Sequence, residues 1–150
     1  MRHVFCYIFL CFILLFIAAN ALAQRHNGLT IEGLVSVEDG SSGNAIIEMY
    51  RDGQRLDDYG IGRDGHYKLE LPYNCKYELI FRREDNFKQK IVVETAVPKA
   101  VLEKNPKFPQ FPVNINLFKE IQGIDDSFSE NTVLKIYYSR KVDNFISELY

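Results

Sequence analysis

Short runs of alternating apolar and polar residues fill positions 29–95, and turn-forming pairs separate them. Alternation of this kind is typical of strands with one buried face, and an Asp-Gly pair favours the tight turn of a hairpin. In the clearest run, 66–71, Tyr67, Leu69 and Leu71 share one predicted face. The pairs are Asp39-Gly40, Asp52-Gly53 and Asp64-Gly65. The pattern predicts an all-β fold, an antiparallel β-sandwich.

Strands are expected over residues 31–37, 45–50, 54–59, 66–71, 77–81 and 87–93. The second is apolar enough to be central in a sheet. The third carries Arg55, Asp57 and Asp58, and we expect it at an exposed edge, where charges discourage pairing between molecules. Inward-facing aromatic and aliphatic side chains from these strands can supply a workable core.

The N-terminus has the pattern of a secretory signal. Met1-Arg2-His3 is basic, residues 4–19 are an unbroken apolar run, and Ala21-Leu22-Ala23 is a small-x-small cleavage site. We expect a signal peptide over 1–23 and a mature chain without a membrane span. An uncleaved anchor is the alternative, because the run is nearly long enough to cross a bilayer. The protein is therefore expected to be exported, to the periplasm, the outer membrane or the medium.

Residues 96–150 differ in composition from the sandwich predicted over 24–95, and we expect them to form a C-terminal extension. Pro98, Pro106, Pro109 and Pro112 fall within fifteen residues. Because proline fixes φ and lacks an N–H, residues 104–112 cannot form a helix or a central strand. Alternation resumes over 111–117 and 133–138, which predicts further strands. Residues 143–150 begin like a helix capped by Asp143 and then stop, which predicts a truncated chain.

The extension is rich in aromatic residues, whose surface needs either a partner or a packing site. These are Phe108, Phe111, Phe118, Phe128, Tyr137, Tyr138 and Phe145. Exposed rings can stack on sugars or dock another protein. The alternative is that the extension folds back on the sandwich as extra strands, and the sequence leaves both open.

Charge and cysteine content narrow the class of protein further. The chain has 18 basic and 20 acidic side chains, and Arg82-Arg83 is followed at once by Glu84-Asp85. No basic stripe results, which argues against nucleic-acid binding. Cys6 and Cys11 lie in the predicted signal peptide, so only Cys75 remains and no internal disulfide is possible. We expect Cys75 to be a half-buried, inert thiol, with pairing to another chain as the alternative.

One motif matches the sequence of a cofactor-binding site but not the structure that such a site requires. Gly60-x-Gly62-x-x-Gly65 matches the dinucleotide fingerprint. That motif holds a pyrophosphate through the N-terminus of a helix that follows it, whereas an alternating strand follows here. We interpret the motif as a turn.

Metal ligands and nucleophiles are equally unconvincing. His26, His66 and Cys75 lack the spacing of a zinc site. Asp57-Asp58 and Asp125-Asp126 belong to no interleaved calcium loop. We therefore expect no enzymatic activity, no catalytic or metal-binding residues and no cofactor.

Four stretches, 33–37, 44–50, 64–72 and 77–81, together resemble the carboxypeptidase regulatory-like, or transthyretin-like, domain. The resemblance covers about residues 29–95. The family commonly has Thr-Asp before its Asp-Gly-x-Tyr turn and Gly after its Leu-Pro, where this chain has Ile61-Gly62 and Asn74. The resemblance implies a seven-stranded sandwich and a non-catalytic accessory or binding module on exported and envelope proteins of Gram-negative bacteria.

These observations predict a non-catalytic envelope protein that binds or helps assemble another envelope or outer-membrane protein. The expected contacts are hydrophobic docking through Phe108 and Phe111 or strand addition at a sheet edge. The alternative is a carbohydrate- or peptidoglycan-binding module, in which Tyr50, Tyr59 and Tyr73 stack on sugar faces.

Overall fold

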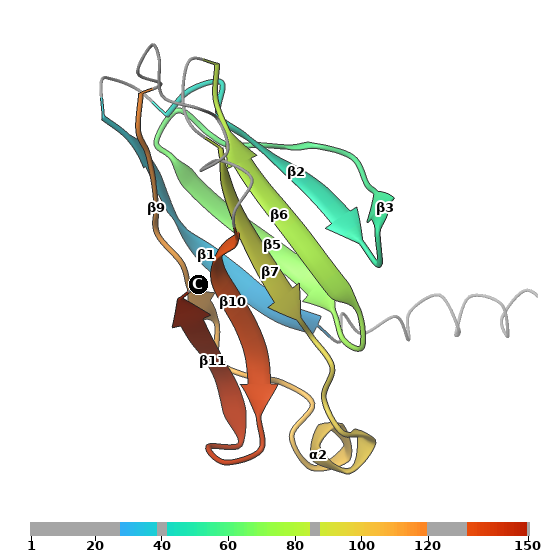
Figure 1. Cartoon of the computed structure of the whole chain (residues 1–150). Coiled ribbons are helices and arrows are strands. Elements are labelled where there is room, and N and C mark those ends of the chain that lie inside the picture. The colour runs from blue at the N-terminus through green and yellow to red at the C-terminus, as the bar shows by residue number, and fades with distance from the viewer. Residues whose placement is uncertain (1–27, 39–41, 85–87, 120–131, 150) are drawn as a thin grey trace, which may run out of the picture.

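The computed structural model describes residues 28–38, 42–84, 88–119 and 132–149, which form two β-sheets packed face to face (Figure 1). The predicted all-β sandwich is therefore confirmed. The predicted signal peptide, residues 1–23, lies outside the described residues. Within the described residues, no helix is long and apolar enough to cross a membrane.

The first sheet is built around its N-terminal strand. It contains β1 (Gly28–Val37), β5 (His66–Pro72), β8 (Phe111–Pro112) and β9 (Ile115–Leu117). β5 pairs antiparallel with one side of β1, and β8 and β9 pair in parallel with its other side. The centre of this sheet is therefore a strand whose two neighbours come from distant parts of the sequence.

The second sheet is larger and more strongly connected through its middle strands. It contains, in spatial order, β11 (Asn144–Leu149), β10 (Thr132–Ser139), β7 (Gln89–Glu94), β6 (Lys76–Arg82) and β2 (Ile46–Arg51), with β3 (Gln54–Arg55) and β4 (Tyr59–Gly60) both paired to β2. β10 and β7 are parallel, and the other described pairs are antiparallel. Two short strands thus form one edge, and β11 forms the other.

The C-terminal extension contributes strands to both sheets. β8 and β9 extend the first sheet, and β10 and β11 extend the second (Figure 1). Every parallel pair joins a strand of the extension to a strand of the predicted sandwich. The described strands of residues 29–95 pair only antiparallel among themselves, as predicted, and the extension makes both sheets mixed.

Three local predictions need correction. The strand expected over 54–59 is two short strands, β3 and β4. A short helix, α2 (Lys99–Lys104), lies in the segment expected to be extended; it begins directly after Pro98 and ends before Pro106. The helix expected from Asp143 is instead β11, because Asp143 adopts a φ of 52° in the turn after β10 and the following residues pair with that strand.

The core lies between the sheets and follows the predicted alternation. Tyr67, Leu69 and Leu71 of β5 are all buried. The alternate residues of β6, in the other sheet, are buried as well and face β5 across the core. The rings of Tyr67 and Phe81 meet edge to face, 5.3 Å between centroids, and so join the two sheets. Aromatic pairs of this geometry add to the free energy gained from burial.

Candidate functional site

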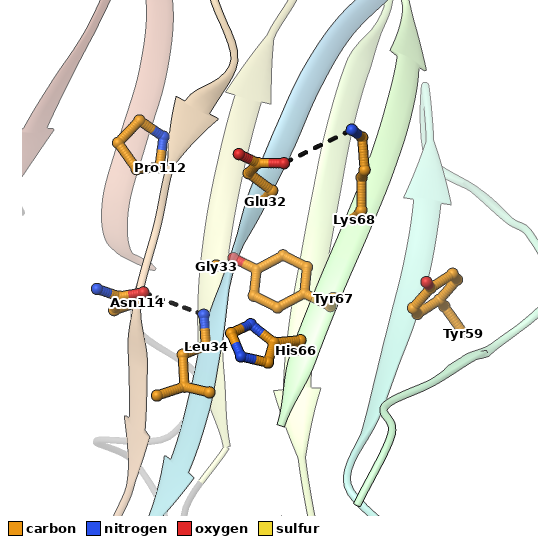
Figure 2. Close-up of a pocket in the computed structure, with 9 residues that line it drawn as sticks. All are labelled: Glu32, Gly33, Leu34, Tyr59, His66, Tyr67, Lys68, Pro112 and Asn114. Atoms are coloured by element: carbon orange, nitrogen blue, oxygen red, sulfur yellow. Dashed lines mark hydrogen bonds and ion pairs between the residues drawn. The ribbon is translucent and has the colours of Figure 1, made fainter. Parts of the chain in front are cut away.

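The outer face of the first sheet carries an open hollow of about 560 Å³ (Figure 2). This volume falls within the range of about 300–1,000 Å³ that is usual for small-molecule sites. Its principal side chains come from β1, β5, β4 and the segment between β8 and β9. They are Glu32, Leu34, Tyr59, His66, Lys68 and Asn114.

The floor of the hollow exists because the pairing of β1 with the extension is interrupted. The register passes from Glu32↔Pro112 to Val35↔Ile115 and skips the two residues between. There the Asn114 side chain substitutes for a backbone acceptor, since its Oδ1 accepts the Leu34 N–H at 3.0 Å (Figure 2). The interruption therefore costs β1 no hydrogen bond at Leu34.

Gly33 is required at this interruption. The Val113 carbonyl oxygen lies where a side chain on Gly33 would begin, so any Cβ would overlap it. Tyr67, directly opposite Gly33 in the β1–β5 register, extends its ring toward this glycine (Figure 2). The Tyr67 hydroxyl donates to the Val113 carbonyl at 2.7 Å. Burial raises the pKa of Tyr67, which keeps this donor protonated.

The polar rim of the hollow is a charge-balanced network. Lys68 Nζ lies 3.6 Å from Glu32 Oε2. In the orientation that satisfies both neighbours, the Gln110 amide donates to Glu32 Oε1 at 2.6 Å and accepts from Lys68 Nζ at 2.8 Å. An exposed ion pair contributes little to stability, about 0–1 kcal/mol. Its effect here is to hold a carboxylate, an amide and an ammonium group side by side.

The aromatic residues expected to dock a partner are packed internally. Phe108 contacts Tyr73, Tyr138 and Phe145, with ring centroids 6.0, 5.7 and 5.1 Å away. Phe111 is half-buried against the core. Phe108 and Phe111 are thus both half-buried, and much of the apolar area that was expected to dock a partner packs within the chain.

The tyrosines proposed for sugar stacking do not lie together. Tyr59 lines the hollow and is 36% exposed. Tyr73 is buried, and no described residue completes a hydrogen bond with its hydroxyl. Burial raises the pKa of the Tyr73 hydroxyl. Tyr50 is half-buried on β2, outside the hollow. Only Tyr59 remains available for stacking at this site.

Several of the remaining candidate residues make local contacts within turns and strands. Gly65 adopts a φ of 78° in the turn before β5, as the turn interpretation of the glycine motif requires. Asp58 accepts a hydrogen bond from Arg55 at 3.1 Å, and Cys75 is half-buried with its thiol 3.7 Å from the Tyr73 carbonyl oxygen. The described ranges contain no cluster of three metal-ligating side chains. His26 and Asp125-Asp126 lie outside those ranges.

The free edge of β5 is protected against further pairing. The Val35 N–H donates to the Gly65 carbonyl, so by alternation along the antiparallel pair the even-numbered residues of β5 turn their backbone groups away from β1. These residues are His66, Lys68, Glu70 and Pro72. The His66 N–H is taken by Asp64 Oδ1 at 3.3 Å, Pro72 has no N–H, and the other two carry charges.

The edge strand of the larger sheet, β11, has such protection only at its start, where the Phe145 N–H donates to Asn144 Oδ1 at 2.8 Å. β11 contains no proline and a single charged residue, Glu148. Leu149 stands opposite Leu134 of β10 on the side of β11 that carries buried Phe145, yet it is 81% exposed. The edges at β3, β4 and β8 are only two residues long, and the edge at β9 is three residues long. Among the described edges, β11 therefore combines length, low charge and an uncovered apolar side chain.

Comparison with known proteins adds no relative, since neither a family model nor a curated protein matches this chain.

Most of the residues that shape the hollow could not be identified from the sequence. Glu32 and Lys68 sat on the polar side of alternating strands, and Gln110 and Asn114 sat in or beside the proline-rich segment. Their meeting depends on a pairing between β1 and residues about 80 positions later. The one local signal was Gly33, a residue without a side chain at a core-facing position of an otherwise apolar series.

Proposed function

We propose that this protein is an exported, non-catalytic β-sandwich module of the cell envelope that binds another envelope protein by strand addition at β11. The observation that carries the proposal is the edge of β11, which beyond its capped start has no proline, one charged residue and an exposed Leu149. The secretory pattern at the N-terminus and the resemblance to carboxypeptidase regulatory-like domains support export and a binding role. Membership of that family is part of the same proposal.

Strand addition suits the chemistry of this edge. Backbone hydrogen bonds to a free edge supply affinity, and pockets for alternate side chains supply specificity. A partner strand beside β11 would continue the larger sheet and cover Leu149 with an apolar side chain of its own. The edge at β5 offers no equivalent because charge, proline and a side-chain cap occupy it.

This mode replaces hydrophobic docking through the aromatic extension. Phe108 and Phe111 contribute to packing, so removing them would weaken the fold before it weakened an interface. The extension still takes part, because it supplies β11 itself.

A lysine substitution tests the edge directly. Lysine on an edge strand discourages pairing, and Leu149 is exposed enough for Leu149→Lys to leave the fold intact. The matched control is Val142→Lys, which introduces the same charge in the adjoining turn at a residue that is 55% exposed. A photo-crosslinking residue placed at Ser147 in the producing bacterium would identify the partner.

We expect Leu149→Lys to lower the yield of the Ser147 crosslink and the affinity for the purified partner by about tenfold, which corresponds to about 1.4 kcal/mol. Val142→Lys should bind as the wild type does. Equal binding by both variants, or a crosslink that forms only from the outer face of the first sheet, would contradict strand addition at β11.

A further inference from the structure

We propose that the hollow on the outer face of the first sheet is a binding site for a neutral saccharide. The hollow lies on β1, β5 and β4, whereas the edge proposed for protein binding is β11, at the other end of the larger sheet from β4. The two proposals are therefore independent.

The hollow presents both kinds of surface that a sugar ring requires. A sugar has an apolar face of C–H groups, which packs against an aromatic ring or aliphatic side chains, and a perimeter of hydroxyl groups, which needs hydrogen-bonding partners. Tyr59 supplies an exposed ring, and Leu34, which is 38% exposed, supplies aliphatic surface. His66 and, further along the sheet beside Lys68, Glu32 supply planar polar groups (Figure 2).

The charge of the hollow selects against anions. Lys68 is paired with Glu32, and Gln110 joins both, so the positive charge is compensated at short range. A phosphate or sulfate site would need an uncompensated cluster of arginine or lysine side chains. A neutral ligand that exchanges hydroxyl hydrogen bonds with a carboxylate and an amide fits this balance better.

The floor of the hollow is fixed before any ligand arrives. Tyr67 ties β5 to Val113, and Asn114 ties the same segment to β1 through the Leu34 N–H. Ordering such groups in advance lowers the conformational entropy lost on binding. Both tying residues act on the protein's own backbone, so the direct contacts to a ligand are assigned to Tyr59, Glu32 and His66.

The experiment is a binding screen of the purified full chain against an array of neutral and acidic oligosaccharides. The strongest neutral binder is then titrated by calorimetry, together with cellotetraose and tetra-N-acetylchitotetraose. We expect Tyr59→Ala to weaken binding by about tenfold, the effect of losing one good stacking contact. Glu32→Gln and His66→Ala should each weaken binding by about three- to tenfold, the range expected for losing one hydrogen bond. Tyr50→Ala, on β2 outside the hollow, is the control and should bind as the wild type does.

Three results would overturn the proposal. The first is that the array retains no neutral glycan. The second is retention only of acidic glycans, with binding that salt abolishes. The third is neutral binding that Glu32→Gln and His66→Ala leave unchanged; both positions are exposed or half-exposed, so these variants give a clear answer even if Tyr59→Ala fails to fold.

Discussion

The hydroxyl of Tyr67 reaches the carbonyl of Val113 across the intervening strand, and it donates a hydrogen bond of 2.7 Å there. The path is open only because Gly33 stands between them without a side chain. One buried tyrosine on β5 is thereby linked to the extension, and its ring also meets Phe81 of the opposite sheet. This side chain connects three parts of the sequence that are far apart along the chain.

Gly33→Ala should destabilise the fold strongly. The new Cβ would overlap the Val113 carbonyl, so the backbone of one strand must move, at a cost of about 2–3 kcal/mol. Gly60→Ala is the matched control, because nothing lies within 4 Å of a Cβ at that position. Urea unfolding of the two variants measures the difference. Equal losses of unfolding free energy would mean that Val113 does not constrain Gly33.

Alkaline pH should weaken the fold through its buried tyrosines. Burial raises the pKa of Tyr67, and burial with a smaller contribution from the Cys75 thiol raises the pKa of Tyr77 to about 12. Because the unfolded tyrosines ionise near their ordinary pKa of about 10, the stability that these groups contribute is complete below that pH. It is lost as the pH rises through the folded values. Each such tyrosine lowers the unfolding free energy by up to about 1.4 kcal/mol per pH unit in this window.

Tyr67→Phe measures how much a single buried tyrosine contributes to this loss of stability at alkaline pH. It removes the hydrogen bond to Val113, which costs about 1–2 kcal/mol at neutral pH, and it also removes one ionisable group from the core. The unfolding free energy, measured in urea from pH 8 to 12, should therefore decline less steeply than that of the wild type. A Tyr67→Phe slope equal to that of the wild type would show that Tyr67 does not resist ionisation.

Phe145→Ala should loosen the extension from the sandwich. Phe145 is 5% exposed, and its ring meets Phe108, Tyr138 and Tyr73, which joins β11 to the loop after β5. Truncating a buried phenylalanine costs about 3–5 kcal/mol. Limited proteolysis should then remove the chain after about residue 95 faster than in the wild type. Phe118→Ala, at a ring that is 51% exposed, should change neither the proteolysis rate nor the stability by a measurable amount.

The strands of residues 29–95 could be predicted because their signals are local. The strand predicted over 66–71 is observed as His66–Pro72, since alternation and the Asp64-Gly65 turn lie within a few residues of each other. The last strand was predicted as a helix because Phe145 and Leu149 have the i, i+4 spacing of a helical face. These residues form a strand because they pair with β10, and the six residues of β11 alone do not reveal that partner.

The hollow could not be predicted for a related reason. Tyr59 was one of three tyrosines expected to stack on sugars, and it lines the hollow with 36% of its surface exposed. Tyr73 has the same side chain, but its ring stacks against Phe145 of the extension and is buried, so it cannot contact a ligand. Gln110 and Glu32 meet through a parallel pairing whose register has no signature in either segment.

The central position of β1 in its sheet also sets an order of events for a chain that emerges from its N-terminal end. β5 can pair with β1 as soon as the first hairpins form, but the partners for the other side of β1 follow only about 80 residues later. Until then, the flank of β1 that will receive β8 and β9 offers unpaired amides and carbonyls to any passing strand. Such late closure slows folding and favours aggregation or chaperone capture in the interval. The extension thus supplies the strands that cover one edge of β1, which the first half of the chain leaves unpaired.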